Sequence, residues 1–261
     1  MTANCILERV NETRSTNDDL LERWRAGELI DPVARIAHKQ TAGKGRAGRS
    51  WLANPEDSLC FSLAFPFQRT PAELSGLSLL VGLAVISGIA QACDLSESKL
   101  HELGLRLKWP NDLLLNNAKL AGILIEGGQA KAGASTWMII GIGINLRNAE
   151  KIEASLDNGF RASSLSQITD SLPDIEYLWL KLIASLEQHL TEFDLHGFKP
   201  CMESWIKWDA YREQAVCISG AGKDAIYGIT KGVDESGALL LQQENKTIAI
   251  HAGDVSLRIQ S

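Results

Sequence analysis

The uncharged segment at residues 74–93 constrains the fold of this chain more than any other feature, because its 20 residues include no Asp, Glu, Lys or Arg. A helix of that length can cross a lipid bilayer. However, its glycines and polar side chains weaken the preference for lipid, and neither flank carries the positive cluster that orients a membrane helix. An apolar helix can equally form the centre of a globular core. We therefore predict a buried central helix and no membrane contact.

The composition supports a globular protein in a reducing compartment. Of 261 residues, 45% are hydrophobic and 22% charged, which are ordinary values for one large domain or two unequal ones. The five cysteines show no C-x-x-C spacing and indicate free thiols. Glu8, Arg9 and Glu12 leave no apolar core for a signal peptide. We predict a cytoplasmic protein.

Hydrophobic periodicity predicts an α+β fold for the first part of the chain. Ser15 offers the hydroxyl of a helix cap, with acids in the following turn and Gly27 as the stop. Asn116 and Asn117 suit a hairpin turn. Strands are predicted at residues 33–38, 58–65, 103–109, 113–115, 121–126 and 137–144.

The pattern changes twice towards the C-terminus. From Pro173, apolar residues recur at helical spacing and predict one long amphipathic helix that ends near Gly197. After Tyr211, turn-forming segments alternate with short apolar runs. We therefore expect two domains, at residues 1–210 and 211–261. Strands in the second are predicted at residues 216–218, 226–233, 239–241 and 248–251.

A basic, glycine-rich loop stands out against the acidic balance of the chain. The net charge of −6 argues against a general nucleic-acid coat. Yet residues 32–55 contain five Lys or Arg and no acid, and they include Gly43-Lys44-Gly45-Arg46-Ala47-Gly48-Arg49-Ser50-Trp51. Glycines expose backbone N–H groups, and the three cations supply charge-assisted hydrogen bonds. The loop predicts an anion site rather than a flexible solvated turn.

The loop also matches two phosphate-binding motifs, and its context excludes both. It satisfies G-x-G-x-x-G, and it differs from G-x-x-x-x-G-K-[ST] by Arg49 in place of Lys. Both motifs need a helix directly after the loop, whereas Asn54 and Pro55 break the chain there.

Two further segments carry candidate chemistry. Lys108 and Lys119 flank a strand–turn–strand, so one sheet face can present both ammonium groups to a common site. A hairpin with solvated lysines is the alternative. Residues 141–145 form an apolar strand with two glycines, which is a sign of close ligand approach. The five histidines show no metal-ligand spacing.

Together these segments resemble the biotin–protein ligase family. Gly-Lys-Gly-Arg-x-Gly-Arg-x-Trp, Lys-Trp-Pro-Asn-Asp, Lys-Leu-Ala-Gly-Ile-Leu-Ile-Glu and Gly-Ile-Gly-Ile-Asn occur in this order, and the resemblance extends to Gly-Ala-Leu-Leu-Leu and Val-Ser-Leu-Arg near the C-terminus. The family usually has Arg where Lys44 stands. Family members that also act as repressors carry an N-terminal helix-turn-helix domain. We expect a monofunctional form without that domain, and no nucleic-acid partner.

The resemblance implies a fold and a reaction. The fold is a mixed-sheet catalytic domain of the biotin/lipoate ligase type with a small C-terminal SH3-like β-barrel. In the reaction, biotin attacks the α-phosphate of ATP, with Mg²⁺ accompanying ATP and no dedicated protein metal site. A lysine of a biotin carboxyl carrier protein then takes the biotinyl group from biotinyl-5′-AMP. Such chemistry needs two anions held together rather than a protein nucleophile. The implied oligomeric state is a monomer or weak homodimer.

The resemblance also implies functions for single residues. Arg46, Lys119 and Asp112 would be catalytic, with Asp112 acting as a base or as a positioning group for the acceptor lysine. The Ser15 and Thr16 hydroxyls also suit a plain helix cap, and one can cap while the other binds ligand. Biotin would contact Ser15, Thr16, Asn17, Gln40, Gly43, Lys44, Gly45, Arg46 and Lys119. The nucleotide would contact Arg46, Arg49, Trp51, Lys108, Asn111, Asn145, Phe160 and Arg258.

Two other functions stay open at this point. A lipoate-type ligase shares the domain plan, although the loop pattern favours biotin. A non-catalytic protein that senses biotinyl-AMP is the other alternative, and the acidic balance disfavours it.

Overall fold

The computed structural model describes residues 5–154, 161–220, 223–244, 246–253 and 255–259. Its larger sheet has seven strands in the order β1-β2-β3-β7-β6-β5-β4. Only β1 and β2 run parallel, and every other neighbouring pair is antiparallel. The sheet is thus mixed, as expected. Its strands are β1 (Ile6–Thr13), β2 (Val33–Gln40), β3 (Ser58–Phe67), β4 (Leu105–Lys108), β5 (Asp112–Leu115), β6 (Ala118–Gln129) and β7 (Thr136–Asn145).

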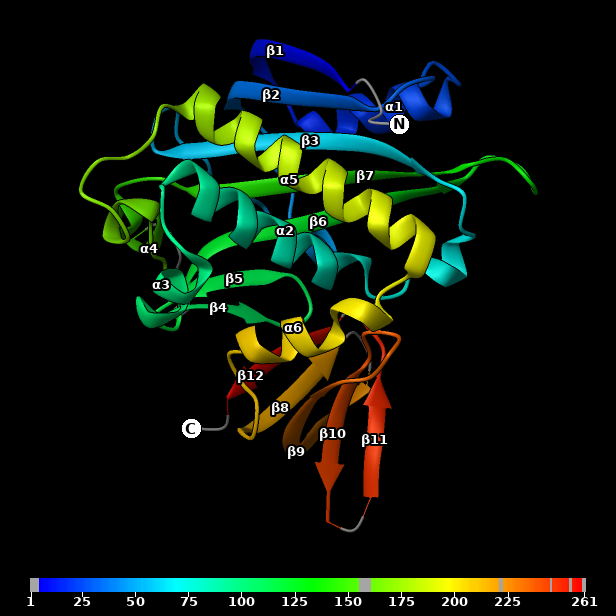
Figure 1. The fold of residues 1–261 in the computed structure, drawn as a ribbon, viewed down its shortest axis with the longest axis vertical. Coiled ribbons are helices and arrows are strands. Elements are labelled where there is room, and N and C mark those ends of the chain that lie inside the picture. Colours follow the sequence, from blue (N-terminus) through cyan, green and yellow to red (C-terminus); the bar gives the residue numbers. More distant parts are fainter. Residues whose placement is uncertain (1–4, 155–160, 221–222, 245, 254, 260–261) are drawn as a thin grey trace.

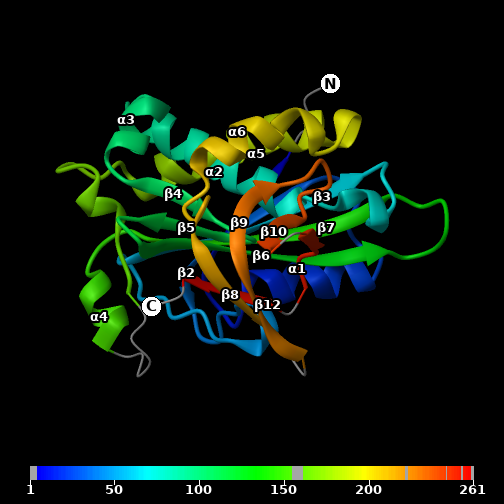
Figure 2. The same cartoon turned by 90° about the horizontal axis from the view of Figure 1, so that it is seen from below.

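Helices cover both faces of this sheet. Figures 1 and 2 show α2 (Leu77–Ala92) and α5 (Ile175–His196) side by side on one face and α1 (Thr16–Arg25) on the other. Strand β3 in the middle is therefore buried on both sides: Leu63 packs in the core beneath α2 and α5, and Ala64 packs in a smaller core beneath α1. A strand that is apolar on both faces has a near-continuous hydrophobic sequence, which is what residues 58–67 show.

The uncharged segment forms the expected central helix. Nearly every residue of α2 is buried, and the helix packs against α5 and the sheet. No helix within the described part of the chain is both long and apolar enough to cross a bilayer. The long amphipathic helix is confirmed as α5, with Asp174 as its N-cap and Gly197 as its C-cap.

The C-terminal part forms a second, separate sheet. Five antiparallel strands lie in the order β11-β10-β9-β8-β12. The expected closure into a barrel is corrected here: among the described residues, β11 and β12 are the two edges of an open sheet. The strands are β8 (Ala215–Gly220), β9 (Lys223–Val233), β10 (Leu239–Gln243), β11 (Lys246–Ile250) and β12 (Val255–Ile259). The boundary at residue 210/211 stays a prediction.

Three short helices complete the described elements: α3 (Glu97–Glu102), α4 (Ala149–Ala154) and α6 (Met202–Trp208). Helix α6 leads from α5 into the second sheet, which lies beyond the β4 edge of the first (Figure 1). There the Trp109 indole donates a hydrogen bond to the Gly237 carbonyl at 3.1 Å, and the Ser75 hydroxyl donates to the Ser236 carbonyl at 2.6 Å. One hydrophobic core runs through both sheets.

Candidate active site

A cavity of about 770 Å³ lies at one end of the larger sheet, and nearly all the predicted site residues line it. Its walls come from the start of α1, the loop at residues 43–51, strands β3 and β5 to β7, and the C-terminal strand β12. The predicted residues that line it are Ser15, Thr16, Asn17, Gln40, Lys44, Gly45, Arg46, Arg49, Trp51, Lys108, Asn111, Asp112, Lys119, Asn145 and Arg258.

Two predicted residues are not among those lining the cavity. Gly43 lies at the base of the loop, where its carbonyl accepts a hydrogen bond from the Trp51 backbone N–H at 2.9 Å. Its prediction as a biotin contact therefore has no support from the cavity geometry. Phe160 lies outside the described residues.

The loop closes on itself as a short hairpin. Lys44 and Ser50 form an antiparallel bridge, and the Gly45 N–H donates to the Arg49 carbonyl at 2.7 Å. At its tip, Ala47 has a left-handed φ of 53°, which is uncommon for a residue with a side chain. Strand β3, not a helix, is the next regular element after Trp51. The rejection of both helix-dependent phosphate motifs is thus correct.

Trp51 lies against two glycines of the sheet. A Cβ added at Gly143 would come within 2.6 Å of the Trp51 ring, and one at Gly122 would come within 3.0 Å. The Lys119 ammonium lies 5.5 Å from the centre of the same ring, within the range of a cation–π contact. Gly143 of β7 and Gly122 of β6 therefore leave space for the Trp51 ring, and the packing of this ring holds the loop against the sheet.

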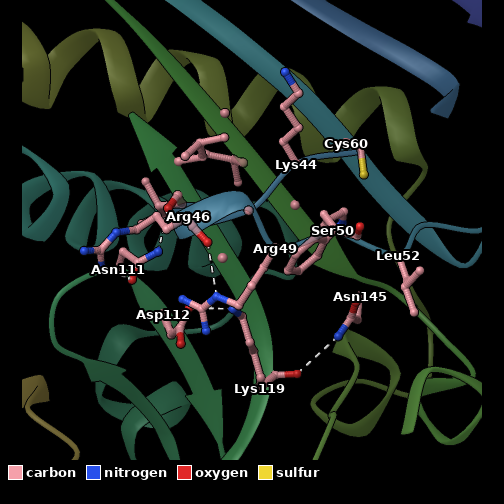
Figure 3. A pocket seen from close by; sticks show the side chains of 18 of the residues that line it. Lys44, Arg46, Arg49, Ser50, Leu52, Cys60, Asn111, Asp112, Lys119 and Asn145 are labelled. Atoms are coloured by element: carbon pink, nitrogen blue, oxygen red, sulfur yellow. Dashed lines mark hydrogen bonds and ion pairs between the residues drawn. The ribbon is translucent and has the colours of Figure 1, made fainter. Parts of the chain in front are cut away.

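Two lysines meet one carboxylate at the basic end of the cavity, where Figure 3 shows Asp112 and Lys119. Asp112 Oδ1 is 2.6 Å from Lys119 Nζ, and Asp112 Oδ2 is 3.9 Å from Lys108 Nζ. All three side chains are about one-fifth exposed, at 18–21%. The alternative of solvated hairpin lysines is therefore wrong.

The pKa of Lys108 is lowered at this end of the cavity. Burial is the main cause that lowers this pKa, and Asp112 opposes it. The positive charges of Lys119, Arg258 and Arg49 lower the pKa further. A bound anion would favour the charged form of Lys108, so this end of the cavity suits a phosphate or carboxylate.

The structure corrects the interpretation of the acid-free segment (residues 32–55) as a single anion site. Three of its five cations are paired with acids of β1 and α1: Arg35 with Glu8 and Asp19, Lys39 with Glu12, and Lys44 with Asp18 at 2.7 Å. The Lys44 side chain points away from Arg46 and Arg49 in Figure 3. Only the latter two bring their guanidinium groups towards the basic end.

Arg46 and Asn145 are held by other parts of the chain. Arg46 donates to Asn111 Oδ1 at 2.9 Å and to the carbonyl of Gly253, so it joins the loop to β5 and to the second sheet. Asn145 Nδ2 donates to the carbonyls of Lys119 and Ser163, both at 3.1 Å. The Asn145 side-chain oxygen is buried and has no hydrogen-bond partner within the described chain. A buried acceptor of this kind calls for a donor from a ligand or water.

The opposite end of the cavity is polar without a cluster of cations. The backbone N–H of Thr16 donates to Gln40 Oε1 at 2.8 Å, and the Thr16 hydroxyl lies 2.7 Å from the Ser62 hydroxyl. The Ser15 hydroxyl accepts from the Asp18 N–H as the helix cap, and both Ser15 and Thr16 line the cavity.

Three residues at this end were not predicted. Ser62 and Cys60 line the cavity from β3, and Glu126 of β6 binds Asn17 from behind it. Alternation along β3 indicates a strand but cannot show which strand residues border a cavity. Burial raises the pKa of the Cys60 thiol to about 12, so this thiol is not a nucleophile.

The expectations about metal and thiol chemistry are compatible with this geometry. All five cysteines are free, although only Cys60 is fully buried. Among the described residues, no three His, Cys, Asp or Glu side chains gather in a way that could hold a metal ion.

Family models match most of the chain. Residues 10–145 match the biotin/lipoate A/B protein ligase family, and residues 214–258 match the biotin protein ligase C-terminal domain.

Individual relatives agree with these matches. The chain is 35% identical to the bifunctional ligase/repressor BirA of Salmonella typhimurium, over 94% of this chain and 72% of that protein. It is 33% identical to the biotin–[acetyl-CoA-carboxylase] ligase of Mycobacterium tuberculosis, over 95% of this chain and 88% of that protein.

A solved structure matches the whole fold. The biotin protein ligase of Aquifex aeolicus in complex with biotin and ATP superimposes with a TM-score of 0.78 at 28% identity, covering 98% of this chain and 99% of that one. The sheet order, the position of the cavity and these similarities agree: the chain belongs to the biotin/lipoate A/B protein ligase family.

Proposed function

We propose that this protein is an ATP-dependent biotin–protein ligase that activates biotin as biotinyl-5′-AMP and transfers it to a lysine of a carrier protein. The observation that carries the proposal is the division of one cavity into two chemically different ends. One end offers neutral hydroxyl and amide groups, and the other gathers Lys108, Lys119, Arg49 and Arg258. This division matches a ligand whose neutral polar head lies at the first end and whose carboxylate lies at the basic end, next to a nucleotide.

In the first step, a biotin carboxylate oxygen attacks the α-phosphorus of ATP, and the bond to the leaving pyrophosphate breaks. Both reactants are anions, so the cavity must offset their repulsion. Lys119, at the basic end, is suited to contact the carboxylate and the α-phosphate together. Arg46 is suited to cover both from the loop, in exchange for its bonds to Asn111 and Gly253.

In the second step, the ε-amine of the acceptor lysine attacks the acyl carbon, an amide forms, and AMP leaves with the electron pair of the broken anhydride bond. The amine must lose its proton before or during attack. Asp112 is the carboxylate at this end of the cavity, and its contact with Lys119 favours a positioning role for the entering amine.

The neutral end of the cavity favours biotin over lipoate. A ureido ring has two N–H donors and a carbonyl acceptor, which Thr16 and Gln40 can pair. A dithiolane ring has no N–H or carbonyl, so it could form no comparable hydrogen bonds with the Thr16 hydroxyl or the Gln40 amide. The geometry therefore supports the biotin assignment over the lipoate alternative.

The remaining parts of the proposal concern cofactor, partner and place. Mg²⁺ would enter as part of the Mg·ATP substrate. The acceptor would be a biotin carboxyl carrier protein or domain. The free cysteines fit a reducing compartment, and we propose the cytoplasm.

The test is a two-stage assay of the purified protein. With Mg·ATP and biotin it should release pyrophosphate, and on addition of a biotin carboxyl carrier domain it should label one lysine. The same assay with lipoate should give neither product. Absence of labelling with biotin, or labelling with lipoate alone, would overturn the proposal.

A further inference from the structure

A line of four hydrogen-bonded side chains runs from behind the cavity to its neutral end. Asn17 Nδ2 donates to Glu126 Oε2 at 2.9 Å, and the Ser62 hydroxyl donates to Asn17 Oδ1 at 2.6 Å. The Ser62 and Thr16 hydroxyls then lie 2.7 Å apart. Thr16, Asn17 and Ser62 are only 1–3% exposed, so the bonds cannot be exchanged readily for bonds to water.

The chemistry of Glu126 sets the direction of every bond in this line. A carboxylate only accepts hydrogen bonds, so the Asn17 amide turns its nitrogen towards Glu126 and its oxygen towards Ser62. Ser62 has one hydroxyl proton, and it goes to Asn17. Ser62 can therefore only accept from Thr16. The Thr16 hydroxyl has two acceptors within the protein, Ser62 Oγ at 2.7 Å and Gln40 Oε1 at 3.2 Å, and the shorter contact takes its proton away from the ligand.

As a result, Thr16 offers the ligand a hydrogen-bond acceptor and Gln40 offers it a hydrogen-bond donor. With its proton on Ser62, the Thr16 hydroxyl presents a lone pair to the cavity. Gln40 Oε1 already accepts from the Thr16 backbone N–H at 2.8 Å, so the remaining polar atom of Gln40 is its amide nitrogen. An acceptor beside a donor is the complement of a ureido N–H beside its carbonyl.

We propose that Glu126 is a specificity-determining positioning residue, which orients the Asn17 amide so that Thr16 accepts, rather than donates, a hydrogen bond at the head of biotin. Glu126 acts through Asn17 and Ser62 and does not touch the ligand. The inference rests on the proposed function, because it concerns how the ureido group is recognised. It also reassigns Asn17 from a biotin contact to a member of this line.

Gly141 leaves the room that the line needs. A Cβ at this position of β7 would overlap the Asn17 side-chain oxygen and lie 3.0 Å from its Cγ. The amide therefore lies flat against β7, with its two ends towards β6 and β3.

The decisive variant replaces the Glu126 carboxylate, a hydrogen-bond acceptor, by an ammonium group, which is a donor. Glu126→Lys forces the Asn17 amide to turn its oxygen towards the ammonium, which reverses the line so that Ser62 donates to Thr16. The Thr16 proton then has only the 3.2 Å contact with Gln40 Oε1, and Ser62 occupies one Thr16 lone pair, so the hydroxyl is a poorer acceptor for the ureido N–H. We expect biotin to bind at least about tenfold more weakly, measured by calorimetry. The isosteric Glu126→Gln allows both orientations, so the loss there should be only about twofold.

A second substitution should restore the original direction. When Asn17→Asp is combined with Glu126→Lys, the carboxylate introduced at position 17 accepts from both the new ammonium and Ser62, as the line requires. The double variant should regain most of the biotin affinity. The matched control is Glu12→Lys, an exposed charge reversal on β1 next to Lys39, which should leave biotin affinity unchanged.

Selectivity separates this role from a structural one. The unmodified protein should bind biotin at least about tenfold more tightly than biotin methylated on both ureido nitrogens. Glu126→Lys should shrink that ratio towards one, and the KM for ATP should not move. A Glu126→Lys protein that keeps the ratio, or a double variant that does not regain it, would overturn the inference.

Two remaining outcomes are also decisive. If Glu126→Lys does not fold, an unchanged biotin affinity in Glu126→Gln would overturn the inference. Failure of the unmodified protein to bind biotin would instead overturn the proposed function.

Discussion

At the scale of single residues, the charge of the basic end depends on Asp112. Its carboxylate lies against Lys119 and near Lys108, so it neutralises part of a cluster that also includes Arg49 and Arg258. The cluster keeps a net positive charge, and its members stay in place before any ligand binds. Such preorganised charge is the most effective way to stabilise a transition state between two anions.

Lys119→Ala should slow the first step by about 100-fold, because it removes the basic-end cation that is proposed to contact both reacting anions. Pyrophosphate release at saturating ATP measures this, and the melting temperature should change by only a few degrees. Lys39→Ala is the control, because Lys39 belongs to the same acid-free segment but pairs with Glu12. Equal rates in the two variants would show that Lys119 is not the relevant cation.

The sequence could predict most of the cavity lining but not its pairing. Gly45, Arg46 and Arg49 stood out because three cations and three glycines are rare in one loop. The salt bridges of Arg35 with Glu8 and of Lys39 with Glu12 could not be seen, because these acids lie 27 residues upstream in β1 and meet the cations only through the parallel register. Ser62 and Glu126 were missed for the same reason: their contacts cross three strands and a helix.

At the scale of elements, long helices and short apolar strands were predictable, whereas the interrupted strand β1 and the short helices α3, α4 and α6 were not. Helices α2 and α5 and the two-residue turn before β6 follow the expected positions, and Asn116 and Asn117 have the positive φ angles of such a turn. Strand β1 was missed because Glu8, Arg9 and Glu12 interrupt its alternation. At the edge of the sheet these charges have partners, and they discourage pairing with a further strand.

The loop at residues 43–51 is held by the contact between Trp51 and the sheet. Gly143→Ala would place a methyl group within the Trp51 ring and should displace the loop. We expect trypsin to cleave after Arg46 or Arg49 several-fold faster, and biotin to bind at least about tenfold more weakly. Gly128→Ala on β6 is the control, since its nearest neighbour, Trp24, is an ordinary 3.7 Å away. Unchanged cleavage in Gly143→Ala would show that Trp51 does not hold the loop.

Asp209, between α6 and β8, lowers the stability of the folded protein in a pH-dependent way. Burial raises the pKa of Asp209 from 3.8 to about 6. Because the folded pKa is the higher one, Asp209 opposes folding progressively as pH rises from about 4 to 6, and fully above that. Asp209→Asn should therefore stabilise the protein above pH 6, by up to about 3 kcal/mol. Urea unfolding at pH 4 and pH 7 measures this; an equal difference at both would contradict it.

At the scale of the whole molecule, the second sheet completes the cavity. Arg258 of β12 lines it together with residues of α1 and β7, and Gly253 binds Arg46 of the loop. The core that joins the two sheets includes Trp109, whose indole also donates to Gly237. The position of the second sheet relative to the first therefore determines where Arg258 lies relative to the other cations of the basic end.

Arg258→Ala should raise the KM for ATP about tenfold and leave biotin affinity within about twofold, because Arg258 belongs to the basic end. Initial rates at varied ATP, with calorimetry for biotin, measure the two effects. Lys246→Ala on β11, an exposed change in the same sheet, is the control. An equal loss of both affinities would mean that Arg258 supports the fold rather than the nucleotide.

The cavity lining spans residues 15 to 258, and this has a consequence for the protein during its own synthesis. Chains emerge from the ribosome N-terminus first, and their domains fold as they appear. The larger sheet can thus form before β12 has been made. A nascent chain would bind the head of biotin early but would lack Arg258 until almost all the described residues had emerged. The reactive acyl-adenylate would therefore be made efficiently only after β12 had formed.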